Sequence, residues 1–238
     1  MLENNKEWFD NFKHSQEYMG FSKEPVAYFC AEFALKSDMP TYIGGLGVLS
    51  GDYVKEAADR KFPIVGIGLF YSESHELNEN SPEKNNGTKG TESRENGLSL
   101  VVDDKNNRVT ISLPIHDRVV RAKAWKWTEG STIVYLLDTN ISENDQTDRQ
   151  ITARLYIPDK EMRIKQEMVL GIGGSRLLQA LHIHPSVYHL NEGHSAFLAL
   201  ELARYEVERR NVDFAKACAF ASQHIAFTNH TLVPAGNE

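Results

Sequence analysis

The sequence predicts an α/β domain built on a parallel sheet, and two patterns carry this prediction. Apolar runs of strand length begin at Val26 (VAYFCAEF) and at Phe62 (FPIVGIGLFY), as is typical of strands buried on both faces. Between them, apolar residues recur at helical spacing from Val48 to Ala58. A strand, a helix and a second strand in this order form a parallel βαβ unit. The 238 residues, 41% of them hydrophobic, suffice for a core on both faces of such a sheet.

The other elements follow in chain order. Residues 1–20 predict one short amphipathic helix, and residues 72–96, almost free of apolar side chains, predict a mobile surface loop. Residues of about 97–138 form four alternating or apolar runs separated by turn residues. We expect these runs to be antiparallel strands joined by hairpins, forming a sheet inserted into the α/β domain.

The last third of the chain returns to α/β patterns. A long helical pattern covers residues 161–183, and a short strand follows at residues 186–190. Two helices at residues 193–210 and 212–225 then precede a strand at residues 226–230. The sequence stops soon after this strand without a closing helix, so we expect the domain to be incomplete.

Composition argues against several classes of function. The formal net charge is −7 and no basic stripe is present, which disfavours a nucleic-acid-binding protein. No apolar run reaches the roughly 18 residues of a membrane span, and the N-terminus lacks the apolar centre of a signal peptide. Cys30 and Cys218 lie in apolar surroundings and are expected to be reduced. We therefore expect a cytoplasmic protein that binds neither nucleic acid nor membranes.

A glycine-rich turn, GGLG from Gly44 to Gly47, leads into the helix predicted from Val48. The start of a helix carries unpaired amides and a partial positive charge, and glycines let a phosphate approach the backbone closely. The same glycines would also suit a tight loop that needs positive φ. No Lys-Ser or Lys-Thr follows, which argues against a P-loop. The turn also lies too far beyond its strand for a dinucleotide fingerprint.

Polar residues follow three predicted strands, at the edge where parallel α/β sheets bind ligands. The residues concerned are Glu32 after the first strand, Asn191, Glu192 and His194 after another, and Thr228, Asn229 and His230 after the last. Helix capping would explain Asn191 alone, but not the whole set. The spacing around Glu192 differs from H-E-x-x-H, so we expect no metal site. Glu32 and Glu192 could form a glycosidase pair, but the sequence does not give their separation.

Four stretches resemble signatures of the α-glucan (glycogen/maltodextrin) phosphorylases, in particular their short prokaryotic branch. They are YIGGLGVLSGD, DKEMRIKQEMVLGIGG, VYHLNEGHSAFLALELAR and FTNHTLVPAGNE, in the order of the family. The resemblance covers the chain from roughly Val26 to its last residue. It implies a GT-B fold, in which two Rossmann-like domains face each other across a cleft. Residues 1–238 would be a partial N-terminal GT-B domain, with the C-terminal domain absent.

The resemblance also implies an activity. Members of this family cut an α-1,4-glucan at its non-reducing end with inorganic phosphate and release glucose 1-phosphate. They use pyridoxal phosphate, whose 5′-phosphate shuttles a proton, and they are often homo-oligomers. The family's cofactor-binding lysine and its basic phosphate-binding residues lie in the domain that we expect to be absent. We therefore expect the chain alone to be inactive, because half a cleft neither excludes water nor positions both phosphates.

By resemblance, His230 would lie against the reacting glucosyl unit, with its carbonyl supporting an oxocarbenium-like transition state. The turn residues Gly44, Gly45, Leu46 and Gly47 would face the phosphate groups, and Leu46 would also line the glucose site through its amide. Glu32 would approach the cofactor-side pocket. The glucan subsites would involve Asn191, Glu192, His194, Thr228 and Asn229. No metal ligand is implied.

Two alternatives stay open. A glucosyltransferase of the glycogen/starch synthase kind also carries a GGLG turn but uses no pyridoxal phosphate, so absorbance of the bound cofactor in the full-length protein would separate the two. A non-catalytic glucan- or anion-binding module would be favoured by a stop codon after residue 238 and a stable product. The segment 72–96 departs from the family, because it lacks the aromatic- and Gln-rich character expected there.

Overall fold

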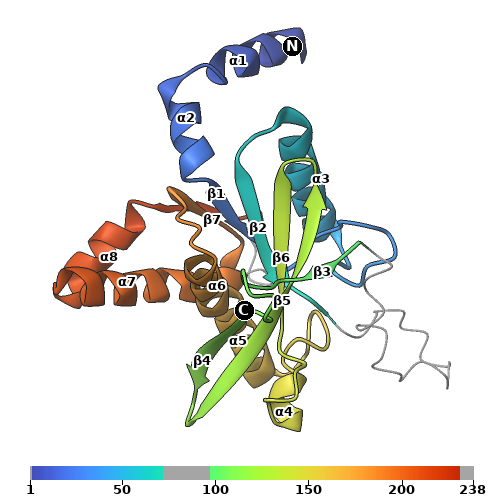
Figure 1. Cartoon of the computed structure of the whole chain (residues 1–238), viewed down its shortest axis with the longest axis vertical. Coiled ribbons are helices and arrows are strands. Elements are labelled where there is room, and N and C mark those ends of the chain that lie inside the picture. Colours follow the sequence, from blue (N-terminus) through green and yellow to red (C-terminus); the bar gives the residue numbers. More distant parts are fainter. Residues whose placement is uncertain (1, 72–96, 231–238) are drawn as a thin grey trace.

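One mixed sheet runs through the protein (Figure 1). The computed structural model describes residues 2–71 and 97–230, and within them the strand order is β3-β5-β6-β2-β1-β7-β8, with β4 paired to β5. The parallel strands are β1 (Val26–Phe29), β2 (Ile64–Leu69), β6 (Thr132–Asp138), β7 (Val187–Asn191) and β8 (Ile225–Thr228). The antiparallel strands are β3 (Ser99–Leu100), β4 (Thr110–Ile115) and β5 (Arg118–Glu129). The loop predicted at residues 72–96 lies outside the described residues.

The expectation of a separate inserted sheet is wrong. Strand β6 pairs in parallel with β2 on one side and antiparallel with β5 on the other, so the hairpins continue the main sheet. The reason lies in the side chains of β6, which are almost all buried (TIVYLLD). A strand that is apolar on both faces belongs in the interior of a sheet, where both of its edges find a partner.

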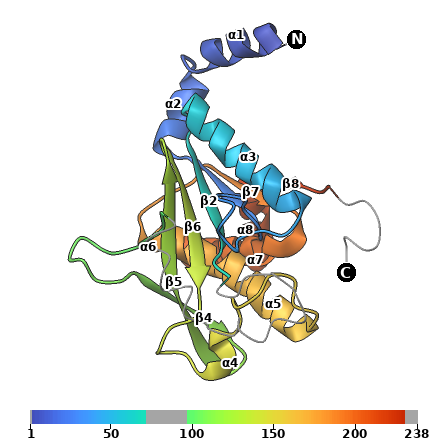
Figure 2. The same ribbon diagram turned by 90° about the vertical axis from the view of Figure 1, so that its right-hand side faces the viewer.

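Helices cover both faces of the sheet (Figure 2). On one face, α3 (Gly45–Arg60) packs over a cluster that includes Tyr28, Val54 and Leu136. The other face carries α5 (Lys160–Met168), α6 (Gly174–Ala180), α7 (Phe197–Arg210) and α8 (Phe214–Ser222). Since Tyr28 and Phe29 are neighbours in β1 but belong to different clusters, each face of the sheet has its own core.

The helix predicted at residues 161–183 is interrupted by one π-helical turn, Val169–Gly173, between α5 and α6. A Cβ on Gly171 would lie 2.5 Å from the amide nitrogen of Leu198, and one on Gly174 would lie 2.6 Å from Cε1 of Phe29. Glycine is therefore required here because α7 and β1 pack directly against the helix backbone.

Several predicted boundaries are wrong. Residues 1–20 form two helices, α1 (Leu2–Phe12) and α2 (Gln16–Lys23), because Ser15 caps the second by accepting a bond from the Tyr18 amide at 3.1 Å. The first strand ends at Phe29 instead of Phe33, since the Phe33 amide turns to bond the carbonyl of Thr41 at 2.9 Å. The short helix α4 (Gln146–Arg149) was not predicted. No helix within the described residues is both long and apolar enough to cross a membrane.

Candidate functional site

The candidate site lies where three strands end. Phe29 of β1 is paired with Leu190 of β7, so the residues that follow these two strands emerge side by side. Asn191 is in turn paired with Thr228 of β8. The parallel arrangement therefore brings Glu32, the Asn191–His194 segment and the Thr228–His230 segment to one edge of the sheet, together with the start of α3.

Glu32 holds the loop that precedes α3. One carboxylate oxygen accepts hydrogen bonds from the amides of Ile43 (2.8 Å) and Gly44 (3.1 Å), and the other accepts one from the Tyr156 hydroxyl. The side chain is 1% exposed. Both carboxylate oxygens are thus already engaged by groups of the protein.

The glycine turn is the first turn of α3, which begins at Gly45 and not at Val48. Gly44 caps the helix without a side-chain hydrogen bond. The amides of Gly45, Leu46 and Gly47 have no acceptor within the helix, because that acceptor would have to lie four residues earlier, before the helix begins. Such amides form an anion-binding position at the positive end of the helix dipole.

The backbone angles and the space around the turn explain why glycines occupy it. Among the described glycines, positive φ occurs at Gly97 and Gly130 and not in this turn, so the tight-loop explanation is wrong. A Cβ on Gly47 would overlap Cβ of Tyr42 and lie 2.9 Å from Oε2 of Glu32, whereas one on Gly45 would have nothing within 4 Å. Gly47 is needed for packing, and Gly45 leaves the helix start open.

His230 is fixed at both its backbone and its ring. Its amide donates to Oε1 of Glu192 at 2.6 Å, and its Nε2 lies 2.8 Å from Oδ1 of Asn191. Asn191 in turn donates to the sulfur of Cys30 at 3.4 Å. Burial raises the pKa of the Cys30 thiol to about 11, so this group stays protonated. Asn191 therefore links β1 to the end of β8 and is not a simple helix cap.

Glu192 has a strained backbone, with φ of 66° and ψ of 176°. This conformation is essentially restricted to glycine and costs of order 1–3 kcal/mol, so it persists only where the surroundings enforce it. Here the Glu192 amide bonds the carbonyl of Thr228 at 2.8 Å while its side chain holds the His230 amide. Both oxygens of Glu32 and Oε1 of Glu192 thus accept hydrogen bonds from groups of the protein, an arrangement in which the two carboxylates hold the backbone in place.

The remaining predicted residues occupy different surroundings. The Thr228 hydroxyl lies 2.7 Å from Nε2 of His189, a strand residue that the sequence did not single out, and Asn229 is exposed. His194 faces Tyr156, with ring centroids 6.4 Å apart. Its Nδ1 is buried and has no hydrogen-bond partner among the described residues.

A pocket opens beside His194, between the ends of β1 and β2 and helix α5. The residues with polar groups that line it are Tyr71, Tyr156, Arg163, Gln166, Glu167 and His194. Burial, followed by the charge of Arg163, lowers the pKa of His194, and burial raises the pKa of Glu167. Tyr156, Arg163 and Glu167 were not predicted as site residues from the sequence. Arg163 and Glu167 belong to the DKEMRIKQEM stretch and lie one helical turn apart, with Nε of Arg163 3.5 Å from Oε1 of Glu167, whereas Tyr156 lies before this stretch. The described residues contain no cluster of three or more potential metal ligands.

Comparison with known proteins adds the following. No protein-family profile matches the chain. It is 37% identical over 246 residues to a maltodextrin phosphorylase of Thermococcus litoralis, an alignment that covers 96% of this chain and 29% of the relative. Glycogen phosphorylases of Mycobacterium tuberculosis (36% identical, 89% of this chain and 25% of the relative) and Aquifex aeolicus (30% identical, 92% and 32%) are also similar. The chain thus spans about a quarter to a third of these relatives' length.

Proposed function

We propose that this chain, which is related in sequence to the glycogen and maltodextrin phosphorylases, forms the N-terminal GT-B domain of an α-1,4-glucan phosphorylase. The complete enzyme would release glucose 1-phosphate from glycogen or maltodextrin with inorganic phosphate. One observation carries the proposal beyond sequence similarity. The amides of the first turn of α3, which have no acceptor within the helix, lie at the same sheet edge as the Asn191–Glu192–His230 cluster. A phosphate site and a sugar site side by side are what phosphorolysis requires.

The phosphate side would use the amides of Gly45, Leu46 and Gly47. Gly44 contributes less directly, because its own amide already donates to Glu32. The Glu32 carboxylate beside the turn disfavours a second anion unless positive charge is added. We therefore propose that this chain alone binds phosphate weakly and that basic residues from outside the chain complete the site.

The sugar side would use His230 and its supports. A carbonyl stabilises a developing positive charge only if it is aimed in advance, so that it need not reorient during the reaction. The two hydrogen bonds that fix His230 to Glu192 and Asn191 would supply that rigidity. His194, whose buried Nδ1 has no partner within the described part of the chain, would be available to a glucan hydroxyl.

The family uses pyridoxal phosphate, which when bound supplies a phosphate group that moves a proton at the substrate phosphate. The described residues fit a phosphate group at the start of α3. They do not fit the covalent attachment, because none of the residues that line the pocket is a lysine. We propose that the attachment lysine lies outside this chain.

An assay of glucose 1-phosphate formation tests this function. The 238-residue chain and the product of the complete reading frame at its locus would each be incubated with maltodextrin and inorganic phosphate. We expect product from the longer protein alone. No product from the longer protein would overturn the proposed activity, and product from the 238-residue chain would overturn the need for further residues. A stop codon after residue 238 and a glucan-binding, inactive chain would favour a binding module.

A further inference from the structure

One contact joins two parts of the site that lie far apart in the chain. The hydroxyl of Tyr156, just before α5, donates to Oε1 of Glu32, which follows β1. The other oxygen of Glu32 accepts from the amides of Ile43 and Gly44, directly before α3. Tyr156 is thereby connected through one carboxylate to the start of the glycine turn.

Tyr156 makes this contact from an unfavourable backbone conformation. Its φ is 55°, in the left-handed region that bulky residues avoid. Burial, followed by the hydrogen bond to Glu32, raises the pKa of its hydroxyl, so the hydroxyl remains a donor at every physiological pH. Such strain persists only where surrounding contacts enforce it, and it clusters at functional sites.

The two ends of Tyr156 face different surroundings. Its hydroxyl reaches Glu32, which is 1% exposed, while the residue as a whole is 47% exposed. Its ring lies beside His194 and at the mouth of the pocket that Arg163 and Glu167 also line. The ring of Tyr156 therefore lies on the side proposed to bind the glucan. Its hydroxyl bonds Glu32, which holds the turn proposed to bind phosphate.

We infer that Glu32 and Tyr156 are a positioning pair, which holds the loop before α3 so that the amides of Gly45, Leu46 and Gly47 stay free and aimed at a phosphate group. This inference rests on the proposed function for the identity of the anion. The pair does not touch the anion itself. Glu32 satisfies the amides immediately before the helix, and Tyr156 keeps its carboxylate turned toward them.

The first test is independent of enzyme activity. Amide hydrogen exchange in the 238-residue chain, measured by NMR, would be compared among wild type, Tyr156→Phe, Glu32→Gln and Glu32→Ala. We expect the exchange of Ile43 and Gly44 to rise about tenfold in Glu32→Ala, as loss of a hydrogen bond to a charged acceptor implies. A smaller rise is expected in Tyr156→Phe and Glu32→Gln, where an oxygen still faces both amides. Exchange in β1 and β2 should stay unchanged.

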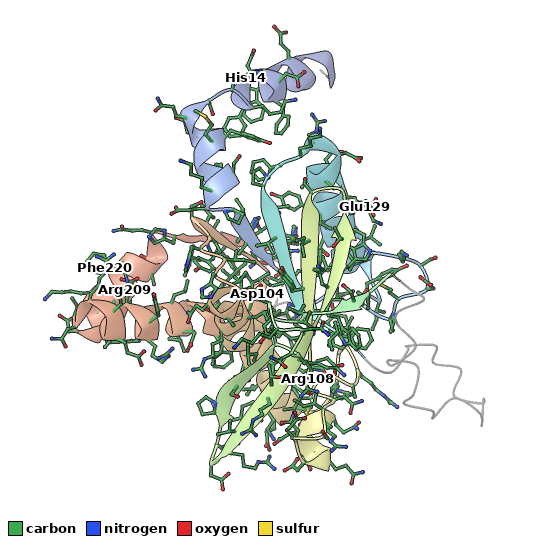
Figure 3. The ribbon with its side chains drawn as sticks, in the orientation of Figure 1. His14, Asp104, Arg108, Glu129, Arg209 and Phe220 are labelled. Carbon is green, nitrogen blue, oxygen red and sulfur yellow. The ribbon has the colours of Figure 1, made fainter. Side chains whose placement is uncertain are left out.

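Two matched variants control for the chemical change alone. Tyr205→Phe removes a hydroxyl from α7, and Glu129→Gln neutralises an exposed carboxylate at the end of β5 (Figure 3). Neither should alter exchange at Ile43 or Gly44. Equal exchange at these two amides in wild type and Glu32→Ala would overturn the inference.

The second test separates positioning from stability. In the active gene product that contains this chain, Tyr156→Phe should raise the KM for inorganic phosphate several-fold, while the KM for maltodextrin stays close to wild type. The melting temperature should fall modestly, because Oε1 of the buried Glu32 loses a donor. An unchanged phosphate KM in an active enzyme would overturn the positioning role and leave the phosphorylase function intact. If the wild-type product shows no activity, the proposed function fails, and the exchange measurement alone decides whether the pair holds the turn.

Discussion

Gly47 shows how a single atom shapes the candidate site. A methyl group there would overlap Cβ of Tyr42 and press on Oε2 of Glu32. Because Glu32 is buried and bonded at both oxygens, it cannot swing away to make room. Gly45, two residues earlier in the same turn, has open space around it. The two glycines therefore have different roles: Gly47 is needed for packing, and Gly45 leaves the backbone accessible.

We expect Gly47→Ala to lower the free energy of unfolding by about 1–3 kcal/mol, the usual cost of overpacking. Gly45→Ala should leave it unchanged or raise it by up to about 1 kcal/mol, because alanine restricts the unfolded chain. Urea denaturation of the two variants and the wild type measures both values. Equal stabilities for the two variants would show that the turn adjusts to a side chain at position 47.

Two half-buried histidines, His189 and His194, make stability depend on pH. Burial and the charge of Arg163 lower the pKa of His194 below its ordinary value of 6.5, and burial and His230 do the same to His189. The unfolded chain therefore binds protons more readily than the folded chain below pH 6.5. The stabilisation is complete above that pH and is lost as the pH falls toward the folded-state pKa values.

We accordingly expect the melting temperature to fall as the pH drops below about 6.5, and to fall less steeply in His194→Gln. His14, an exposed histidine in the turn between α1 and α2 (Figure 3), provides the control, and His14→Gln should follow the wild-type profile. Thermal melts monitored by circular dichroism across this range are sufficient. Parallel profiles of melting temperature against pH for His194→Gln and wild type would show that His194 does not contribute to the pH dependence.

At this scale, the sequence predicted the gathering of Glu32, Asn191, Glu192 and His230, because each directly follows a strand and parallel strands end at one edge. It did not predict Tyr156 as the partner of Glu32. The two are 124 positions apart, and no periodic pattern connects them. The role of Gly47 was equally hidden, since clash with a side chain from another segment leaves no local signal.

Among the elements, the strands were predicted well where their burial was unambiguous. The apolar runs that became β1 and β2 are recognisable because both faces of these strands are covered. Strand β6 was predicted as a strand, and its antiparallel pairing with β5 is confirmed, but its parallel partner β2 was missed, because an apolar run of this length fits a hairpin as well as the centre of a sheet. The π turn at Val169–Gly173 depends on how α7 packs, which the local sequence does not contain.

Glu201 of α7 joins two helices and the sheet. It is 3% exposed and accepts hydrogen bonds from Arg176 of α6 and Arg204 of its own helix at 2.8 Å. Arg176 also donates to the carbonyl of Ser112 in β4 at 2.6 Å. We expect Glu201→Ala to lower the free energy of unfolding by about 1–3 kcal/mol, because two arginines lose their partner in a partly buried place.

Glu208 supplies the comparison within the same helix. It also pairs with Arg204, but its side chain is 62% exposed. Exposed ion pairs contribute little, so Glu208→Ala should change stability by less than about 0.5 kcal/mol. Urea denaturation of both variants measures the difference. Similar values for the two substitutions would show that burial of Glu201 does not strengthen its pairs.

At the scale of the whole molecule, the candidate site lies at one side of the sheet rather than in its middle. Strand β8 is the last in the strand order, and within the described residues it pairs with β7 alone (Figure 2). The relatives named as phosphorylases are about three to four times as long as the segment that matches this chain. Within the described residues, one edge of β8 is therefore without a strand partner.

Such an edge predicts self-association of the 238-residue chain. Exposed strand edges pair with other chains unless charges, prolines or bulges block them, and Ala226 and Phe227 of β8 are both exposed and apolar, Phe227 to 56%. We expect sedimentation velocity to show dimers or larger species that increase with protein concentration. Ala226→Lys places a charge on the edge strand and should shift the chain toward the monomer with its melting temperature nearly unchanged. Val119→Lys replaces another exposed apolar residue, on β5, and should leave the association as it is. A wild-type chain that stays monomeric at all concentrations, or equal effects of the two lysines, would show that β8 is not the contact.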